Sequence, residues 1–342
     1  MFRLISLAAF ISLITVCAAG AWAQPGGSSN PLMTRHLVDI GGGRRMNVVC
    51  TGKGSPTVVF EYGLGGHLLN WQRVQPAISA LTTACFYDRA GYGDSDRSAR
   101  SATAQSATDD LYRLLKKAGV QMPIVLVAHS LGALYATLYT DRFPGDVAGL
   151  VLIDPLFAGE DLNETPEEQA RAQAAFDRSQ AWMSGCRQRA RDRLLSLRSL
   201  AGCIPLLPDQ TAAEREWLAA QFSNPGRWDT MLSESKNLHA PNALSEDEKE
   251  EQAAQRTFAD MPLIVLTAGI IPAQPGEPSD EHEKSVAHWR AGHDRLAARS
   301  SQGQSIVVPN ATHMIQLDQP QVVIDAIRKV VQTVRSPRAG NR

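Results

Sequence analysis

The sequence predicts an α/β fold, in which a mostly parallel β-sheet carries helices on both faces and a helical segment is inserted into it. Three observations lead to this prediction. Short, solidly apolar runs such as Ile124–Val127 and Leu263–Leu266 suit strands that are buried on both faces of a parallel sheet. Helical patterns alternate with these runs, which is typical of a sheet covered on both sides. One long interval, Phe157–Asp260, has helical patterns and no strand-like run.

Eight apolar runs are expected to form strands. In chain order they are Arg35–Ile40, Arg45–Cys50, Thr57–Glu61, Thr83–Tyr87, Ile124–Ala128, Gly149–Ile153, Leu263–Thr267 and Ser305–Val308. Helical periodicity between them predicts helices at Trp71–Leu81, Thr108–Ala118, Leu131–Arg142, Glu281–Ser300 and Gln321–Val334. The first strands have no helix between them, and we expect them to pair as an antiparallel edge of the sheet.

The interval Phe157–Asp260 is about 100 residues long, and an unstructured loop of that length inside a compact domain is improbable. Its helical patterns, Glu167–Arg178 and Arg187–Leu200, favour an insertion that covers the strand ends. The expected organisation is one α/β domain formed by residues 35–156 and 261–336, with residues 157–260 as a helical cap. The charged run Glu246–Glu251 fits a solvated helix face.

The N-terminus has the features of a secretory signal. Arg3 supplies a positive charge, and the apolar run Leu4–Val16 is shorter than the roughly 20 residues of a membrane-spanning helix. Ala21-Trp22-Ala23 fits an A-x-A cleavage site. We expect residues 1–23 to be a signal peptide, cleaved between Ala23 and Gln24, and residues 24–34 to be a flexible leader. The protein would be secreted or periplasmic, with no stable membrane anchor after cleavage.

Export changes how the cysteines are interpreted. The chain has five cysteines, and Cys17 would leave with the signal peptide. An even number in an oxidising compartment favours disulfides, and the four that remain are Cys50, Cys85, Cys186 and Cys203. Four cysteines allow three pairings, and spacing alone does not choose between them. Four buried free thiols are the alternative.

Composition excludes some classes of function. Lys and Arg number 34 against 35 Asp and Glu, and without a long basic run the chain lacks the electrostatic signature of a nucleic-acid-binding protein. His282, His288 and His293 do not share a helix face, and their spacing matches no zinc motif. We expect neither a metal nor an organic cofactor. The sequence carries no signal for the oligomeric state.

The segment Ala128-His129-Ser130-Leu131-Gly132 stands between an apolar strand and a helical run. This is the setting of the G-x-S-x-G turn, which exposes a nucleophilic serine at the top of a sheet. The positions two before and two after the serine must be small, and alanine at the first keeps this requirement. Ser130 is therefore the candidate nucleophile. The alternative is a serine that only caps the following helix.

A glycine-rich loop, Tyr62–Gly66, follows the predicted strand that ends at Glu61. Glycines let the backbone approach a substrate oxygen closely. Acyl transfer needs two preorganised N–H donors at the position where the oxyanion forms. The expected donors are the amides of Leu64 and Leu131. A phosphate cradle is disfavoured because neither glycine-rich phosphate motif is complete.

His313 follows the last predicted strand and precedes the last helix. A histidine at this position can act as general base toward Ser130 and later as general acid toward the leaving group. The alternative is a loop histidine without a role. The order serine and then histidine, with the histidine near the C-terminus, is the order of a large class of hydrolases.

With these motifs in this order, the chain resembles the serine hydrolases of the α/β-hydrolase fold superfamily. The resemblance runs from about Arg35 to about Val334 and includes the turn Asp88–Asp96, in which Asp88 and Arg89 are expected to be hydrogen-bonding scaffold. It implies an eight-stranded sheet with an antiparallel second strand and a helical cap after the sixth strand. Tyr62-Gly63 stands where the family often has His-Gly. The donor amide survives that change, but the supporting contacts of the histidine do not.

The resemblance also bears on the cysteines. In the family layout the second and fourth strands are neighbours, which would set Cys50 beside Cys85. It therefore favours the pairing Cys50–Cys85 with Cys186–Cys203.

The carboxylate that would orient His313 is placed after the seventh strand in most relatives. In this chain residues 269–276 contain no Asp or Glu, and Glu277, Asp280 and Glu281 are candidates only if the proline-rich loop folds back. A minority of relatives place the acid after the sixth strand, where this chain has Asp154. A lone carboxylate that closes an apolar strand beside the site needs a partner. We therefore favour Asp154 over Asp280, with a turn-capping role for Asp154 as the alternative.

The function that follows is an exported serine hydrolase that cleaves a carboxylic ester or a related small acyl compound through an acyl-enzyme intermediate. Alternatives of the same fold are a peptidase or amidase, a lactonase, and a non-catalytic ligand-binding relative. Epoxide hydrolases and dehalogenases of this fold use an aspartate nucleophile, and Ser130 argues against both. Four tryptophans are candidates for an apolar acyl pocket or for plain packing: Trp71, Trp182, Trp217 and Trp228.

Overall fold

The computed structural model describes residues 30–159, 165–197, 202–204, 206–241 and 243–336. The predicted signal peptide and most of the predicted leader lie outside these residues. None of the helices in the described part of the chain combines the length and the hydropathy of a membrane-spanning segment.

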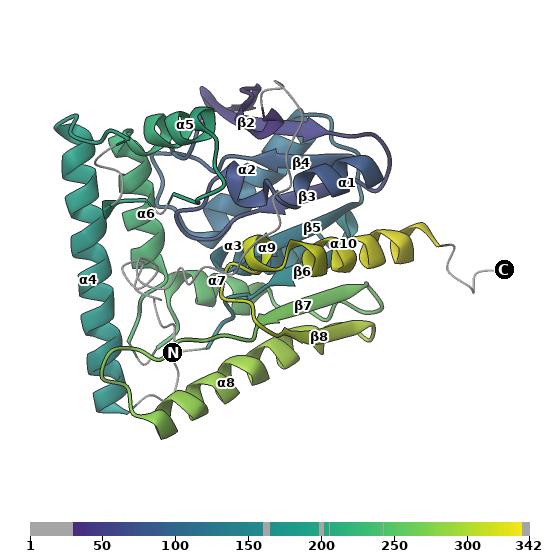
Figure 1. Cartoon of the computed structure of the whole chain (residues 1–342). Helices are drawn as coiled ribbons and strands as arrows, with labels where there is room; N and C mark the ends of the chain where they lie inside the picture. The colour runs from purple at the N-terminus through teal and green to yellow at the C-terminus, as the bar shows by residue number, and fades with distance from the viewer. Residues whose placement is uncertain (1–29, 160–164, 198–201, 205, 242, 337–342) are drawn as a thin grey trace.

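An eight-stranded sheet forms the centre of the molecule (Figure 1). Its strands are β1(Leu37–Gly41), β2(Arg44–Thr51), β3(Val58–Glu61), β4(Ala84–Tyr87), β5(Ile124–His129), β6(Val147–Ile153), β7(Leu263–Ala268) and β8(Gly303–Val308). Their order across the sheet is β1-β2-β4-β3-β5-β6-β7-β8. The strand β2 is antiparallel to β1 and β4, and all other neighbours are parallel. The predicted fold class, with its antiparallel second strand, is confirmed.

Alternate residues of the strands face two separate helical layers, because successive side chains of a strand point to opposite faces. Val58 and Phe60 belong to a core shared with α1 and α10, whereas Val59 belongs to a core shared with α2, α3 and α8. The helices of these two layers are α1(Gln75–Leu81), α10(Pro320–Arg335), α2(Ala104–Lys117), α3(Leu131–Arg142) and α8(Ser279–Ala297). Short helical segments complete this part of the chain: η2(Pro31–Met33), η3(Leu68–Trp71), η4(Pro144–Asp146) and α9(Ile315–Asp318).

Two helix starts differ from the sequence prediction by four residues, one because of a capping box and one where a proline stands in the first turn. The helix predicted from Thr108 begins at Ala104. The Thr103 side chain accepts a hydrogen bond from the Ser106 amide, and the Ser106 side chain accepts one from the Thr103 amide, which forms a capping box. The helix predicted from Trp71 begins at Gln75, with Pro76 in its first turn. In both cases the predicted element is present and only its boundary moved.

In the described part of the interval between β6 and β7 the helices are α4(Pro166–Arg191), α5(Ala212–Phe222), α6(Pro225–Asn237) and α7(Glu246–Ala254). Figure 1 shows α4 and α6 side by side at one end of the molecule, with α5 close to them. The prediction of a separate helix at Arg187–Leu200 is wrong. The helix α4 runs unbroken through Gly185 to Arg191, since a single glycine weakens a helix without ending it. The chain then turns at Arg193, which has a φ of 57°, and residues 198–201 lie outside the described part.

The helix α7 packs against the α/β part of the molecule, and the predicted solvated face is wrong for Asp247, Glu248 and Glu251, which are buried, while Glu246 is exposed. Asp247 is fully buried and accepts the Ala104 amide at 2.7 Å, and Glu251 forms an ion pair of 2.7 Å with Arg299. The sequence prediction failed here because the partners of these carboxylates lie far away along the chain. These contacts fasten the end of the inserted segment to α2 and to the segment that follows α8.

The described residues contain two disulfides, in the pairing that the family resemblance favoured. Cys50 and Cys85 are direct partners in the register of β2 and β4, and they are joined. Cys186 of α4 is joined to Cys203. The first bond crosses the antiparallel edge of the sheet, and the second ties α4 to the segment before α5.

Candidate active site

Ser130 stands in the turn between β5 and α3 with a φ of 55° and a ψ of −126°. A residue other than glycine rarely adopts this conformation, and such backbone strain is characteristic of functional sites. The turn is held by the Ser130 amide, which donates to the Ile153 carbonyl at 3.0 Å. Close packing explains why glycine is needed at position 132, where a Cβ would lie 2.6 Å from the Tyr62 carbonyl oxygen.

His313 lies in the loop after β8 and contacts Asp154 at the end of β6. Its Nδ1 lies 2.6 Å from Asp154 Oδ2. Since a carboxylate only accepts, Nδ1 carries the proton and the lone pair of the neutral ring is on Nε2. The His313 carbonyl accepts from His129 Nε2 at 2.9 Å, and the two rings lie 4.6 Å apart. Burial, and to a smaller extent the neighbouring His313, lowers the pKa of His129 to about 3, so the His129 ring is neutral.

Asp154 has three hydrogen-bond donors at its carboxylate. Besides His313, the Ala268 amide donates to Oδ1 at 2.9 Å and Trp289 Nε1 donates to the same oxygen at 3.1 Å. Burial acts to raise the pKa of this carboxyl, but the hydrogen bond and the charge of His313 outweigh it and the pKa lies below its ordinary value. Asp154 is therefore an ionised, oriented carboxylate. Its φ of 42° is a second strained backbone position in the site.

Asp280 is not near His313 Nδ1. It lies in the first turn of α8 with its side chain 75% exposed, and it pairs with Lys284 at 3.3 Å. The structure thus brings His313 together with Asp154 and leaves the alternative acid at the surface.

Within the described residues no hydrogen bond joins Ser130 Oγ to His313. Catalytic hydrogen bonds are often long when no substrate is bound. The two residues are linked through their neighbours, because His129 precedes Ser130 and binds the His313 carbonyl. Ser130, Asp154 and His313 follow the carboxyl ends of β5, β6 and β8, which meet at one edge of the sheet, where open α/β sheets bind ligands.

The loop Tyr62–Gly66 borders Ser130. A Cβ added to Gly63 would lie 2.9 Å from Ser130 Cβ, so only glycine allows this approach. Leu131 is the first residue of α3, and the first amides of a helix have no partner within the helix. Leu64 and Leu131 therefore lie on the two segments that meet at Ser130.

Two arginines fix this loop from behind, and the sequence predicted only Arg89, as hydrogen-bonding scaffold. Arg89 donates to the carbonyls of Tyr62 and Gly63, and Arg227 of α6 donates to the carbonyls of Gly65 and Gly66. The sequence predicted the scaffold role of Arg89 but not the groups that it binds. Arg227 gave no signal, because it lies about 160 residues from its partners in a segment without a recognisable motif.

The aromatic side chains divide between packing and the surroundings of the loop. Trp71 and Trp228 are fully buried in the core, whereas Trp182 and Trp217 are partly exposed. His67, directly after the loop, meets Trp217 and Phe222 of α5 edge to face. The inserted helices thus cover the side of the loop that follows Gly66.

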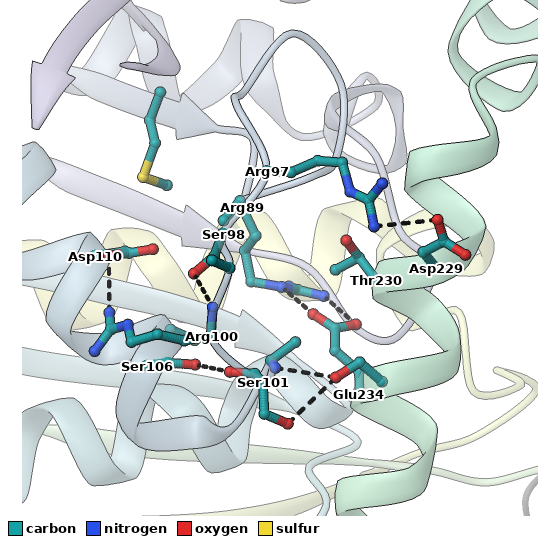
Figure 2. A pocket seen from close by; sticks show the side chains of 16 residues that line it. Arg89, Arg97, Ser98, Arg100, Ser101, Ser106, Asp110, Asp229, Thr230 and Glu234 are labelled. Atoms are coloured by element: carbon teal, nitrogen blue, oxygen red, sulfur yellow. Dashed lines mark hydrogen bonds and ion pairs between the residues drawn. The ribbon is translucent and has the colours of Figure 1, made fainter. Parts of the chain in front are cut away.

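Two cavities lie outside the immediate surroundings of Ser130. One, of about 280 Å³, lies between the segment 97–107 and α6 and is lined by polar side chains that include Arg97, Arg100 and Glu234 (Figure 2). The other, of about 370 Å³, lies between Gly269 and the first half of α8. Neither is lined by Ser130 or His313. The described residues contain no group of three or more His, Cys, Asp or Glu side chains able to hold a metal ion.

The chain is similar to several known proteins. Residues 63–326 match the sequence profile of the alpha/beta hydrolase family. The uncharacterized protein YqjL of Bacillus subtilis is 31% identical over 205 residues, which cover 55% of this chain and 79% of YqjL. The (lyso)-N-acylphosphatidylethanolamine lipase of Homo sapiens is 24% identical over 283 residues, covering 81% of this chain and 79% of the lipase.

Solved structures with low sequence identity share the fold. The epoxide hydrolase CorEH superposes with a TM-score of 0.63 at 19% identity, covering 88% of this chain and 99% of CorEH. An esterase from Thermogutta terrifontis superposes with a TM-score of 0.58 at 19% identity, covering 89% of this chain and all of that chain. At these identities the similarity concerns the fold and not the reaction.

Proposed function

Because the chain belongs to the alpha/beta hydrolase family, we propose that it is a serine hydrolase, with Ser130 as nucleophile, His313 as general base and Asp154 as the orienting acid. The observation that carries this proposal is the 2.6 Å hydrogen bond between His313 Nδ1 and Asp154 Oδ2, at the edge of the sheet where the strained Ser130 turn lies. An ionised, buried carboxylate on Nδ1 leaves the Nε2 lone pair free to accept a proton.

The reaction would proceed in two halves. His313 Nε2 removes the proton of Ser130 Oγ as this oxygen attacks the ester carbonyl, and the imidazolium then protonates the leaving alcohol. In the second half, water gives a proton to Nε2 and attacks the acyl-enzyme, which releases the acid and restores the serine hydroxyl. Asp154 stays ionised throughout and stabilises the imidazolium.

The negative charge that develops on the carbonyl oxygen needs two N–H donors. The amides of Leu64 and Leu131 supply them in this proposal. The packing of Gly63 on Ser130 and the place of Leu131 at the start of α3 support this assignment. The positive end of the α3 dipole adds to the stabilisation.

A carboxylic ester or a related small acyl compound is the proposed substrate class. One relative with about four fifths coverage is by name a lipase, and an esterase is among the similar structures. Epoxide hydrolases and dehalogenases are structural neighbours too, but the serine at position 130 separates this chain from their aspartate chemistry. Amide and lactone cleavage by the same residues are the competing reactions.

We also propose that the protein is exported to an oxidising compartment. The two disulfides support export, because such bonds are rare in reducing compartments. N-terminal sequencing of the protein recovered from the periplasm or the medium tests this point. A mature chain that begins at Gln24 supports the proposal, and an intact N-terminus in the cytoplasm contradicts it.

A panel of p-nitrophenyl esters of increasing acyl length, run beside matched anilides and lactones, tests the activity. The proposal expects ester turnover in the wild type and its loss in Ser130→Ala. The control Ser101→Ala removes the hydroxyl of an exposed serine and should leave the rates unchanged. Equal rates in wild type and Ser130→Ala would overturn the proposal. Turnover restricted to anilides or lactones would change the substrate class alone.

A further inference from the structure

Arg89 is a buried cation that reaches the back of the glycine loop. Its side chain is 4% exposed. Nη1 donates to the Tyr62 carbonyl at 2.5 Å, and Nη2 donates to the Gly63 carbonyl at 3.1 Å. A buried guanidinium whose N–H groups donate to backbone carbonyls fixes the conformation of those peptides. Several charge-assisted hydrogen bonds have to break together for the loop to move.

Two carboxylates on either side hold Arg89 itself. Glu61 at the end of β3 accepts from Nη1 at 2.5 Å. Glu234 of α6 accepts from Nε at 2.9 Å and from Nη2 at 3.2 Å (Figure 2). Tyr92 donates to Glu234 at 2.5 Å. The inserted helix α6 is thus fastened to the α/β part through Arg89.

The geometry of a peptide bond connects these contacts with the oxyanion site. The C=O of Gly63 and the N–H of Leu64 belong to one planar trans peptide and point in opposite directions. A guanidinium that fixes the carbonyl on one side therefore fixes the direction of the amide on the other. Gly63 itself abuts Ser130, so this peptide borders the nucleophile.

We infer that Arg89 is the positioning residue of the oxyanion site: its bond to the Gly63 carbonyl aims the Leu64 amide at the substrate oxygen, and Glu234 of the inserted helix α6 keeps Arg89 in place. This inference rests on the proposed serine hydrolase activity and adds a part played by the inserted segment in the chemical step. The charge on the carbonyl side also polarises the peptide, which strengthens the amide as a donor.

Arg227 supports the same loop further along. It is 1% exposed, and its Nη2 donates to the carbonyls of Gly65 at 2.5 Å and Gly66 at 2.8 Å. Arg227 and Glu234 both belong to α6. The helix α6 therefore fixes the loop directly through Arg227, and indirectly because its Glu234 holds Arg89.

Lysine cannot replace arginine in this arrangement. The planar fork of a guanidinium reaches two carbonyls and two carboxylates at once, whereas an ammonium group is a point charge with three donors. Arg89→Lys keeps the charge and loses the fork. It therefore separates the aiming of the loop from the charge that Arg89 places between Glu61 and Glu234.

The chain offers a matched control in Arg299. This arginine is also buried, with a side chain 7% exposed, and it bridges two carboxylates, Asp141 at 2.5 Å and Glu251 at 2.7 Å. Its partners lie on α3 and α7 and not on the glycine loop. Arg299→Lys should lower stability as Arg89→Lys does, without an effect on the chemical step.

The experiment compares wild type, Arg89→Lys and Arg299→Lys by kcat and KM on the best ester, by melting temperature, and by affinity for a trifluoromethyl ketone. Serine adds to the carbonyl carbon of this ketone and places a negative oxygen in the oxyanion site. Losing one oxyanion donor typically lowers kcat about 100- to 1,000-fold. We expect Arg89→Lys to lose kcat and ketone affinity in parallel by about 100-fold, with KM within about threefold. Arg299→Lys should change only the melting temperature.

Equal kcat in folded Arg89→Lys and Arg299→Lys would overturn the inference, as would a change confined to KM. Should Arg89→Lys not fold, Glu234→Gln tests the same path, because the amide keeps the shape and loses the charge that holds Arg89. A reduced kcat with unchanged KM supports the inference, and an unchanged kcat in the folded variant overturns it. A wild type that neither turns over esters nor binds the ketone refutes the proposed function, and the inference falls with it. An active wild type with active Arg89 and Glu234 variants refutes the inference alone.

Discussion

Replacing Asp154 by asparagine changes which nitrogen of His313 carries the proton. In the wild type the carboxylate accepts the proton of His313 Nδ1 at 2.6 Å. Asparagine can keep Oδ1 as acceptor for the Ala268 amide and for Trp289, which lie at 2.9 and 3.1 Å. Its NH₂ group then occupies the position of Oδ2 and donates toward Nδ1. The ring must move its proton to Nε2, where it can no longer accept a proton from Ser130.

The size of the effect follows from the loss of both base and imidazolium stabilisation. A wrong tautomer of this kind lowers kcat about 10⁴-fold while the geometry of the site persists. That factor corresponds to about 5 kcal/mol of transition-state stabilisation. Because the amide replaces the carboxylate with the same shape and keeps two of three hydrogen bonds, we expect a change of melting temperature of only a few degrees.

The assay is steady-state hydrolysis of the best p-nitrophenyl ester by purified wild type, Asp154→Asn and Asp280→Asn. Asp280 is the matched control, because it is the other acid that the sequence allowed and its side chain is 75% exposed. We expect the Asp280 variant to match the wild type within about twofold, since it has no contact with the site. A folded Asp154→Asn that keeps a tenth of the wild-type kcat would refute this reasoning, and so would a large loss in Asp280→Asn.

Three further predictions concern the loop, a buried acid and a disulfide. Gly63→Ala would place a Cβ 2.9 Å from the Cβ of Ser130, so kcat should fall about 100-fold. In the control Gly145→Ala the new Cβ meets no atom within 4 Å, and kcat should stay unchanged. Equal kcat values in the two variants would contradict the packing argument. Burial raises the pKa of Glu61 from 4.5 to about 7. Between these pH values the carboxyl group keeps its proton in the folded state and loses it in the unfolded state. The free energy of unfolding should therefore fall by about 3 kcal/mol as the pH rises from 4.5 to 7. Urea unfolding at several pH values should show a flatter profile for Glu61→Gln, and an unchanged slope would show that Glu61 is ionised in the fold. Replacing Cys186 and Cys203 together by serine opens a loop with a sequence separation of 17 and should lower the free energy of unfolding in urea by about 3 kcal/mol. An unchanged free energy of unfolding would show that the two cysteines are reduced in the wild type.

The fold was predictable because its signals are local. The run Ile124–Ala128 is solidly apolar and follows Pro123, and its short length together with this flanking residue favours a buried strand. The positions of Ser130 and His313 at one edge of the sheet were predictable for the same reason, since each lies between a strand and a helix. The boundaries moved where capping decides them, as at Thr103.

Contacts between distant segments were not predictable from local patterns. The carboxylates of α7 were expected in solvent, but Asp247 and Glu251 are buried against α2 and Arg299. Likewise Glu234 meets Arg89 across 145 positions of the chain. A charged residue in a helical pattern is predicted to be exposed unless a residue that pairs with it is known. A single sequence does not show which distant residue that is.

The most direct test of the account is the site at which a fluorophosphonate reacts. In this reaction the serine oxygen bonds to phosphorus and fluoride leaves. We predict one adduct per chain, located by peptide mass spectrometry on Ser130 and absent in Ser130→Ala, with labelling slowed in Asp154→Asn. No adduct on the active, folded protein, or an adduct on another residue that persists in Ser130→Ala, would contradict the account.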